Sequence, residues 1–86
     1  MMHDLKCWPE FFKAVWYGTK RFELRKNDRN FNIGDQLNIR EWDPIKEKYT
    51  GRSLVTKITY ILESEILPKS YVILSLSEPI SKTEVL

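Results

Sequence analysis

The amino-acid sequence predicts a mainly β domain of the α+β class, with one N-terminal helix and about five strands. The chain has 86 residues, which is enough for one domain with one small core. Apolar residues follow helical spacing in one stretch near the N-terminus and alternate with polar residues afterwards. So few elements cannot cover both faces of a flat sheet. We therefore expect the sheet to curl into a small barrel, with the helix at one end or side.

The N-terminal region is predicted to contain a short strand followed by the helix. Residues 5–8 form the strand, and Pro9 suits the first turn of a helix because its missing N–H has no helical partner there. Gly18 is a candidate C-cap. We expect a helix over residues 9–17 whose aromatic side packs on the core. Apolar side chains follow helical spacing at Phe11, Phe12, Val15 and Trp16.

The remaining strands are predicted from alternation and from the turn-forming residues between them. They cover residues 20–26, 36–42, 53–62 and 71–76. In the third strand, Leu37, Ile39 and Glu41 share one face. In the fourth, the in-phase residues are Leu54, Thr56, Ile58, Tyr60 and Leu62. Residues 46–51 are expected to form a polar loop.

Composition excludes several classes of protein. No apolar run is long enough for a membrane span, and the N-terminus lacks a signal-peptide core. The single Cys7 cannot form an internal disulfide, which is typical of a cytoplasmic protein. His3 and Cys7 would lie about 13 Å apart on one strand, so we expect a core thiol and no Cys–His pair. No Cys/His cluster has metal-ligand spacing, and we expect no metal, no cofactor and no membrane partner.

The charge is unevenly distributed, although the net charge is only +2. Residues 13–29 contain six basic and two acidic side chains, and such a patch attracts phosphates. Within it, Arg21, Glu23 and Arg25 share one face of the second predicted strand, opposite Phe22 and Leu24. This charged face is either an ordinary solvated surface or the floor of a polar site, and charge alone favours the former.

Several motifs, taken together, resemble a bacterial and phage family. In order they are Leu5-Lys6-x-x-Pro9-Glu10-x-Phe12, Gly18-x-Lys20-x-Phe22-Glu23-x-Arg25-Lys26-Asn27-Asp28-Arg29, Gly34-Asp35, Arg40-Glu41-Trp42-Asp43-Pro44 and Tyr49-Thr50-Gly51-Arg52. Their order and spacing resemble the DUF3850 family, a group of the ASCH (activating signal cointegrator homology) and PUA-like superfamily. The resemblance implies one domain over residues 1–77, folded as a PUA-like pseudobarrel, and leaves residues 78–86 as a C-terminal tail.

The resemblance also implies a cleft between the helix and the barrel, bordered by the Gly-x-Lys-x-x-Glu-x-Arg segment. ASCH domains are proposed to bind RNA or modified nucleosides. One small ASCH-like group hydrolyses the acetyl amide of N4-acetylcytidine with a Lys, a Thr and a Glu. That Lys matches Lys20, but the Thr falls on Glu23, and the later Glu has no assigned counterpart.

The candidate site residues each allow a structural alternative. In the functional interpretation, the charged side chains contact phosphate or a base edge. In the structural interpretation, they form ordinary ion pairs on the surface. Trp8 and Trp42 either stack a nucleobase or pack in the core. Asn27, Asp28, Gly34 and Asp35 are interpreted as turn residues. The candidate nucleic-acid-binding residues are Lys20, Arg21, Glu23, Arg25, Lys26, Trp8, Trp42 and Arg40.

Three functional hypotheses follow. The first is a module that binds RNA, another nucleic acid or a modified nucleoside, favoured by the basic patch, the interleaved aromatic residues and the resemblance. The second is a small amidohydrolase that acts on a modified nucleoside such as N4-acetylcytidine, with Lys20 and Glu23 as catalytic groups. The third is a domain of phage or prophage origin that binds a protein partner without chemistry.

Overall fold

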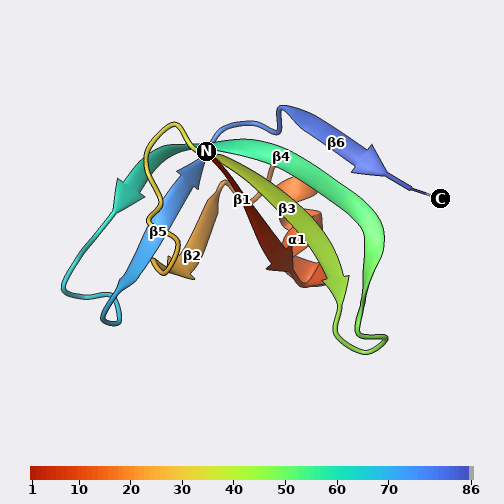
Figure 1. Ribbon diagram of the computed structural model, residues 1–86, viewed down its shortest axis with the longest axis horizontal. Helices are drawn as coiled ribbons and strands as arrows, with labels where there is room; N and C mark the ends of the chain where they lie inside the picture. Colours follow the sequence, from red (N-terminus) through yellow and green to blue (C-terminus); the bar gives the residue numbers. More distant parts are fainter. Residues whose placement is uncertain (86) are drawn as a thin grey trace.

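The computed structural model describes residues 1–85, which form one helix and six strands (Figure 1). The sheet has the order β1-β3-β4-β5-β2, and β6 also pairs with β4. The predicted mainly β class with one short N-terminal helix is confirmed. The elements are β1 (Met2–Cys7), α1 (Pro9–Trp16), β2 (Phe22–Lys26), β3 (Gln36–Asp43), β4 (Lys48–Leu62), β5 (Tyr71–Leu76) and β6 (Ser81–Glu84).

The sheet curls along β4, which has 15 residues and belongs to both halves of the sheet. The first part of β4 pairs antiparallel with β3, and the part from Ile58 onward pairs antiparallel with β5. In Figure 1, β4 arches over the molecule, with β3 on one side and β5 on the other. A register shift between Ile58 and Tyr60 marks the bend.

This shift overturns one expectation about the face that β4 buries. Leu54, Thr56 and Ile58 are buried as predicted, but Tyr60 is 57 % exposed and Leu62 is 39 % exposed. A bulge inserts an extra residue and thereby changes the alternation of side chains beyond it. The predicted alternation is therefore wrong for Tyr60 and Leu62, at the end of β4.

The two ends of the sheet, β1 and β2, are joined by side chains. β1 pairs in parallel with β3, and β2 pairs antiparallel with β5. No ladder joins β1 to β2 within residues 1–85. Instead, the Arg25 guanidinium donates to the carbonyl of Lys6 at 2.6 Å, and that of Arg29 donates to the carbonyl of Asp4. The sheet is thus curled without being closed by backbone pairing.

The core lies between the curled sheet and α1. From the helix, Phe12 and Val15 are buried, whereas Phe11 is 51 % exposed. Cys7 is a buried core thiol, as predicted. Gly18 follows the helix with a φ of +80°, a conformation that suits glycine in a helix C-cap. The most deeply buried aliphatic residues of the sheet are Leu5, Leu37, Ile39, Leu54, Ile58 and Leu74.

The segment expected to be a tail contains the sixth strand. β6 pairs antiparallel with β4, with Ser81 opposite Val55 and Glu84 opposite Arg52. All four residues of β6 are exposed. The expected tail also includes Leu86, which lies outside the described residues. The boundary at residue 77 remains a prediction.

Candidate functional site

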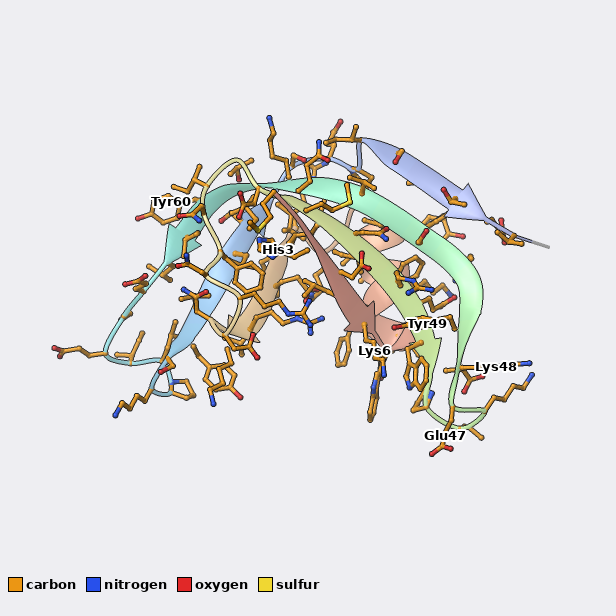
Figure 2. The ribbon with its side chains drawn as sticks, viewed as in Figure 1. His3, Lys6, Glu47, Lys48, Tyr49 and Tyr60 are labelled. Atoms are coloured by element: carbon orange, nitrogen blue, oxygen red, sulfur yellow. The ribbon has the colours of Figure 1, made fainter. Side chains whose placement is uncertain are left out.

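A groove of about 930 Å³ lies between β1 and β2, beside the start of α1. We call it the β1–β2 groove. Lys6 and Cys7 come from β1, and Figure 2 labels Lys6 near the end of that strand. Trp8, the N-cap residue of α1, and Phe11 in its first turn also contribute, and every residue of β2 lines the groove. The two unpaired ends of the sheet therefore form its walls.

Glu23 is the buried acid of this groove, with 4 % of its surface exposed. Its Oε1 accepts a hydrogen bond from Nζ of Lys20 at 2.8 Å, and its Oε2 accepts one from Nε of Arg25 at 3.0 Å. Nζ of Lys20 also donates to the carbonyl of Phe22 at 2.6 Å. A buried carboxylate needs such partners, because burying an unpaired charge costs several kcal/mol or more.

Strand alternation explains why the charged face points inward. Glu23 is buried and Arg25 is partly buried, whereas Phe22 and Leu24 are 49 % and 50 % exposed. Phe22, Leu24 and Lys26 thus lie on the exposed face of β2, and Glu23 and Arg25 face the interior. Of the three residues on the predicted charged face, Glu23 is buried and Arg25 is partly buried, whereas Arg21 is exposed.

The groove carries an excess of positive charge. Asp28 joins Glu23 as the second acid among its lining residues. The guanidinium groups of Arg25 and Arg29 are fixed by carbonyls of β1, and this fixation lowers the conformational entropy lost when they bind a ligand. A cleft with an excess of positive charge raises the local concentration of anions. The basic lining residues are Lys6, Lys20, Arg25, Lys26 and Arg29.

Half-exposed aromatic rings lie around this charged floor. Trp8 is 53 % exposed, Phe11 is 51 % exposed and Phe22 is 49 % exposed, and all three line the groove. Large apolar side chains gathered on one concave surface are typical of a binding site. The combination of flat apolar rings and fixed cations suits a planar ligand that carries negative charge.

Cys7 lines the groove but is poorly suited to nucleophilic chemistry. Burial, together with the negative charge of Glu23, raises the pKa of the Cys7 thiol to about 12. The thiolate is the reactive form of cysteine, so this thiol is inert near neutral pH. The groove thus offers no activated thiol.

The structure brings five of the eight predicted site residues together in the groove and places three elsewhere. Lys20, Glu23, Arg25, Lys26 and Trp8 line it. Arg21 points away and pairs with Glu78, with Nη2 and Oε1 3.0 Å apart. Arg40 and Trp42 lie on β3, which is not one of the two strands that form the groove walls. Both side chains contact Tyr49.

Sequence reasoning missed several lining residues that carry a charge or an aromatic ring. Lys6, Phe11 and Arg29 were not among the candidates, although all three line the groove. Arg29 belonged to the basic window at residues 13–29, and that window was the signal that could have found it. Phe11 belonged to the apolar helical pattern, which does not distinguish a core residue from one beside a groove.

A second buried acid, Glu41, belongs to a structural cluster in another part of the sheet. Its Oε1 accepts hydrogen bonds from the Thr50 hydroxyl at 2.6 Å and from Nε of Arg52 at 3.0 Å. Burial acts to raise the pKa of Glu41, but these hydrogen bonds outweigh it and hold the pKa below its usual value. The Arg52 guanidinium also lies 5.4 Å from the ring of Phe12, so the cluster connects the sheet to α1.

Residues 2–76 match the model of a family described as "Domain of unknown function (DUF3850)". The chain belongs to the DUF3850 family. Every residue that lines the β1–β2 groove lies within the matched span, whereas β6 lies beyond it. The groove is therefore built entirely from the DUF3850 part of the chain.

A relative of this DUF3850 domain occurs in Escherichia phage P2. The chain is 36 % identical over 73 residues to its "Uncharacterized 12.9 kDa protein in GpA 3'region". The aligned part covers 85 % of this chain but 65 % of the phage protein, so the chain spans less than two thirds of that relative. A phage homologue is consistent with the bacterial and phage family that the motifs resemble.

Two further observations concern only residues 1–85. No helix in that part is long and apolar enough to cross a membrane. No group of three or more His, Cys, Asp or Glu side chains there is arranged to hold a metal ion.

Proposed function

We propose that this DUF3850 domain is a nucleic-acid-binding module of the ASCH and PUA-like type, which takes RNA or a modified nucleoside in the β1–β2 groove. One observation carries the proposal. The buried Glu23 carboxylate is held by Lys20 and Arg25 at the floor of a groove whose rim includes the half-exposed ring of Trp8. Such a site combines a flat stacking surface with fixed polar groups.

Each group has a role in binding a nucleotide. The Trp8 ring stacks on a base, a contact worth about 1–3 kcal/mol. Each Glu23 oxygen accepts one hydrogen bond from the protein and retains a lone pair for a base amino group. Lys26 and Arg29 follow Arg25 in the sequence, and their positive charges bind phosphate oxygens.

The family resemblance supports the same site. PUA-like domains are pseudobarrels, and this sheet curls without closing. The resemblance implies a cleft bordered by the Gly-x-Lys-x-x-Glu-x-Arg segment, and the observed groove contains Lys20, Glu23 and Arg25. Fold kinship alone does not establish function, so the proposal depends mainly on the chemistry of the groove.

Fluorescence anisotropy with labelled single-stranded RNA tests the proposal. If Lys26 and Arg29 each contact a phosphate, the logarithm of the affinity falls against the logarithm of salt concentration with a slope of about −1.4. Trp8→Ala is expected to weaken binding by about 5- to 150-fold, the equivalent of one lost stacking contact. Tyr60→Ala is the matched control, because Tyr60 is a similarly exposed aromatic residue outside the groove (Figure 2).

The contrary results are equally specific. The absence of binding at low salt, for both RNA and free nucleotides, would exclude a nucleic-acid-binding role for the groove. Equal losses in Trp8→Ala and Tyr60→Ala would show that the groove is not the binding site. A salt-independent affinity would show that its cations do not contact phosphates.

The contact between Lys20 and Glu23 also supports a second candidate, an amidohydrolase. Nζ of Lys20 and Oε1 of Glu23 lie 2.8 Å apart within the groove. No Ser or Thr is among the lining residues described, so the nucleophile would be water. Glu23 would accept the proton of that water as its oxygen attacks the amide carbon, and the proton would then pass to the departing nitrogen. Incubation with N4-acetylcytidine tests this, and equal turnover by Lys20→Ala would remove Lys20 from the mechanism.

A further inference from the structure

We infer that the bound nucleic acid continues out of the groove across a second surface, so that the ligand is a single strand of several nucleotides. This inference rests on the proposed function and specifies the ligand of the same site. The second surface consists of two aromatic rings in contact with each other, each covered by one cation, and we call it the cation–aromatic ladder. Its members are Lys6, Trp42, Tyr49 and Arg40.

The ladder is continuous. Nζ of Lys6 lies 3.9 Å from the centroid of the Trp42 ring. The Trp42 and Tyr49 rings meet edge to face, with centroids 4.9 Å apart. The guanidinium carbon of Arg40 lies 3.6 Å from the centroid of the Tyr49 ring. Figure 2 labels Lys6 and Tyr49 beside the turn between β3 and β4.

Strand geometry places these side chains on the outer side of the sheet. On β3, Leu37, Ile39 and Glu41 are buried, so Arg40 and Trp42 point to the opposite face. Trp42 and Tyr49 lie opposite each other in the antiparallel pair of β3 and β4. Lys6 alternates with the buried residues of β1 in the same way. The cation–aromatic ladder therefore covers the face opposite the core.

The two cations of the ladder have no acidic partner within residues 1–85. Neither Lys6 nor Arg40 forms a salt bridge there, whereas Arg25 and Arg52 each pair with a carboxylate. Stacking on an aromatic ring leaves the N–H groups at the edge of a guanidinium free to donate. These positive charges are therefore available to phosphate oxygens, and the partly exposed rings beside them are available to bases.

Lys6 joins the two surfaces. It lines the β1–β2 groove and also covers the Trp42 ring. A strand whose base occupies the groove would pass Lys6 and then meet the rings of Trp42 and Tyr49. Proteins that bind single strands combine a cationic path with successive stacking rings in this way. The combination of charges and rings on one surface favours a nucleic acid over an acidic peptide, which has no bases to stack.

The experiment compares a mononucleotide with a pentanucleotide RNA, by titration calorimetry at several salt concentrations. We expect the pentanucleotide to bind at least about tenfold more tightly and with a steeper salt slope, because it reaches more cations. Arg40→Gln should reduce the slope for the pentanucleotide by about 0.7 and leave mononucleotide binding unchanged. Lys57→Gln, which removes an equal charge from an exposed position outside both surfaces, should change neither.

A second variant, Trp42→Leu, keeps apolar bulk at the position and removes the stacking ring. It should weaken pentanucleotide binding alone, and its circular dichroism should match that of the wild type. If both ligands bind equally and Arg40→Gln has no effect, the extended path is wrong, while the proposed function of the groove stands. If neither ligand binds, the proposed function fails and the extended path fails with it.

Discussion

Arg52 holds the carboxylate of Glu41 through two parallel hydrogen bonds, from Nε to Oε1 at 3.0 Å and from Nη2 to Oε2 at 3.1 Å. Three residues of β4, Thr50 to Arg52, face the single residue Glu41 where the β3–β4 register shifts. This bulge directs the side chains of Thr50 and Arg52 toward the same carboxylate. The pair thus depends on an irregularity of the backbone.

Arg52→Ala is expected to destabilise the domain by about 2–4 kcal/mol, because it leaves a buried carboxylate without its cation. The expected loss is below the largest values known for buried pairs, since the Arg52 side chain is 26 % exposed. Urea unfolding followed by tryptophan fluorescence measures the loss. Arg21→Ala is the control, because its pair with Glu78 is solvent-exposed and should contribute less than about 1 kcal/mol. Equal losses in the two variants would contradict this account.

The pair also predicts a pH dependence of stability. The pKa of folded Glu41 lies below its usual value of 4.5, so folding favours the ionised carboxylate. The resulting stabilisation is fully present above pH 4.5 and is lost as the pH falls through the lowered pKa. Glu41→Gln should therefore be less stable than wild type at neutral pH, and the difference should shrink in acid. Thermal unfolding between neutral and acidic pH checks this, and a constant difference would refute it.

Gly51→Ala should be more destabilising than Gly34→Ala, although both glycines have a positive φ, +100° and +95°. A Cβ at Gly51 would lie 2.8 Å from the carbonyl oxygen of Val85, whereas nothing lies within 4 Å of one at Gly34. Each variant bears a conformational cost of about 1 kcal/mol, and Gly51→Ala must also displace Val85. Hydrogen exchange should show faster exchange in β6 for Gly51→Ala alone. Unchanged protection of β6 would contradict the predicted contact.

Cys7 should react very slowly with a thiol reagent such as DTNB in the folded protein. With a pKa of about 12, one thiol in ~10⁴ is ionised at pH 8, and the residue is buried. Reaction is expected to be fast in denaturant. Glu23→Gln should raise the native rate, since the Glu23 charge contributes to the high pKa. A native rate equal to the denatured rate would show that Cys7 is accessible.

Much of the fold could be predicted from local patterns. β5 begins and ends as expected, at Tyr71 and Leu76, because a short apolar run flanked by turn residues has few alternatives. The helix was predicted to within one residue, ending at Trp16 and not at residue 17, because Pro9 and Gly18 delimit it. β4 begins earlier than predicted, at Lys48, because Gly51 suggested a loop, whereas it occupies a bulge within the strand.

The site was harder to predict because it depends on which strands become neighbours. Alternation placed Glu23 and Arg25 on one face, but the burial of that face follows from the curl that brings β2 opposite β1. Trp42 and Arg40 belong to a separate surface, since β1 lies at the sheet end between them and the groove. The contact between Arg29 and the carbonyl of Asp4 could not be predicted from the sequence, because it depends on how the chain folds in three dimensions.

The parallel pairing of β1 with β3 has a consequence for the order of folding. β3, β4 and β5 follow one another along the chain and pair antiparallel, so they form through short loop closures. β1 must return from the N-terminus to pair Leu5 with Ile39, and a long loop closes slowly. We therefore expect the β3–β5 meander to form first and β1 to dock late. A ligand that contacts β1 across the groove would then mainly slow unfolding and leave the folding rate nearly unchanged.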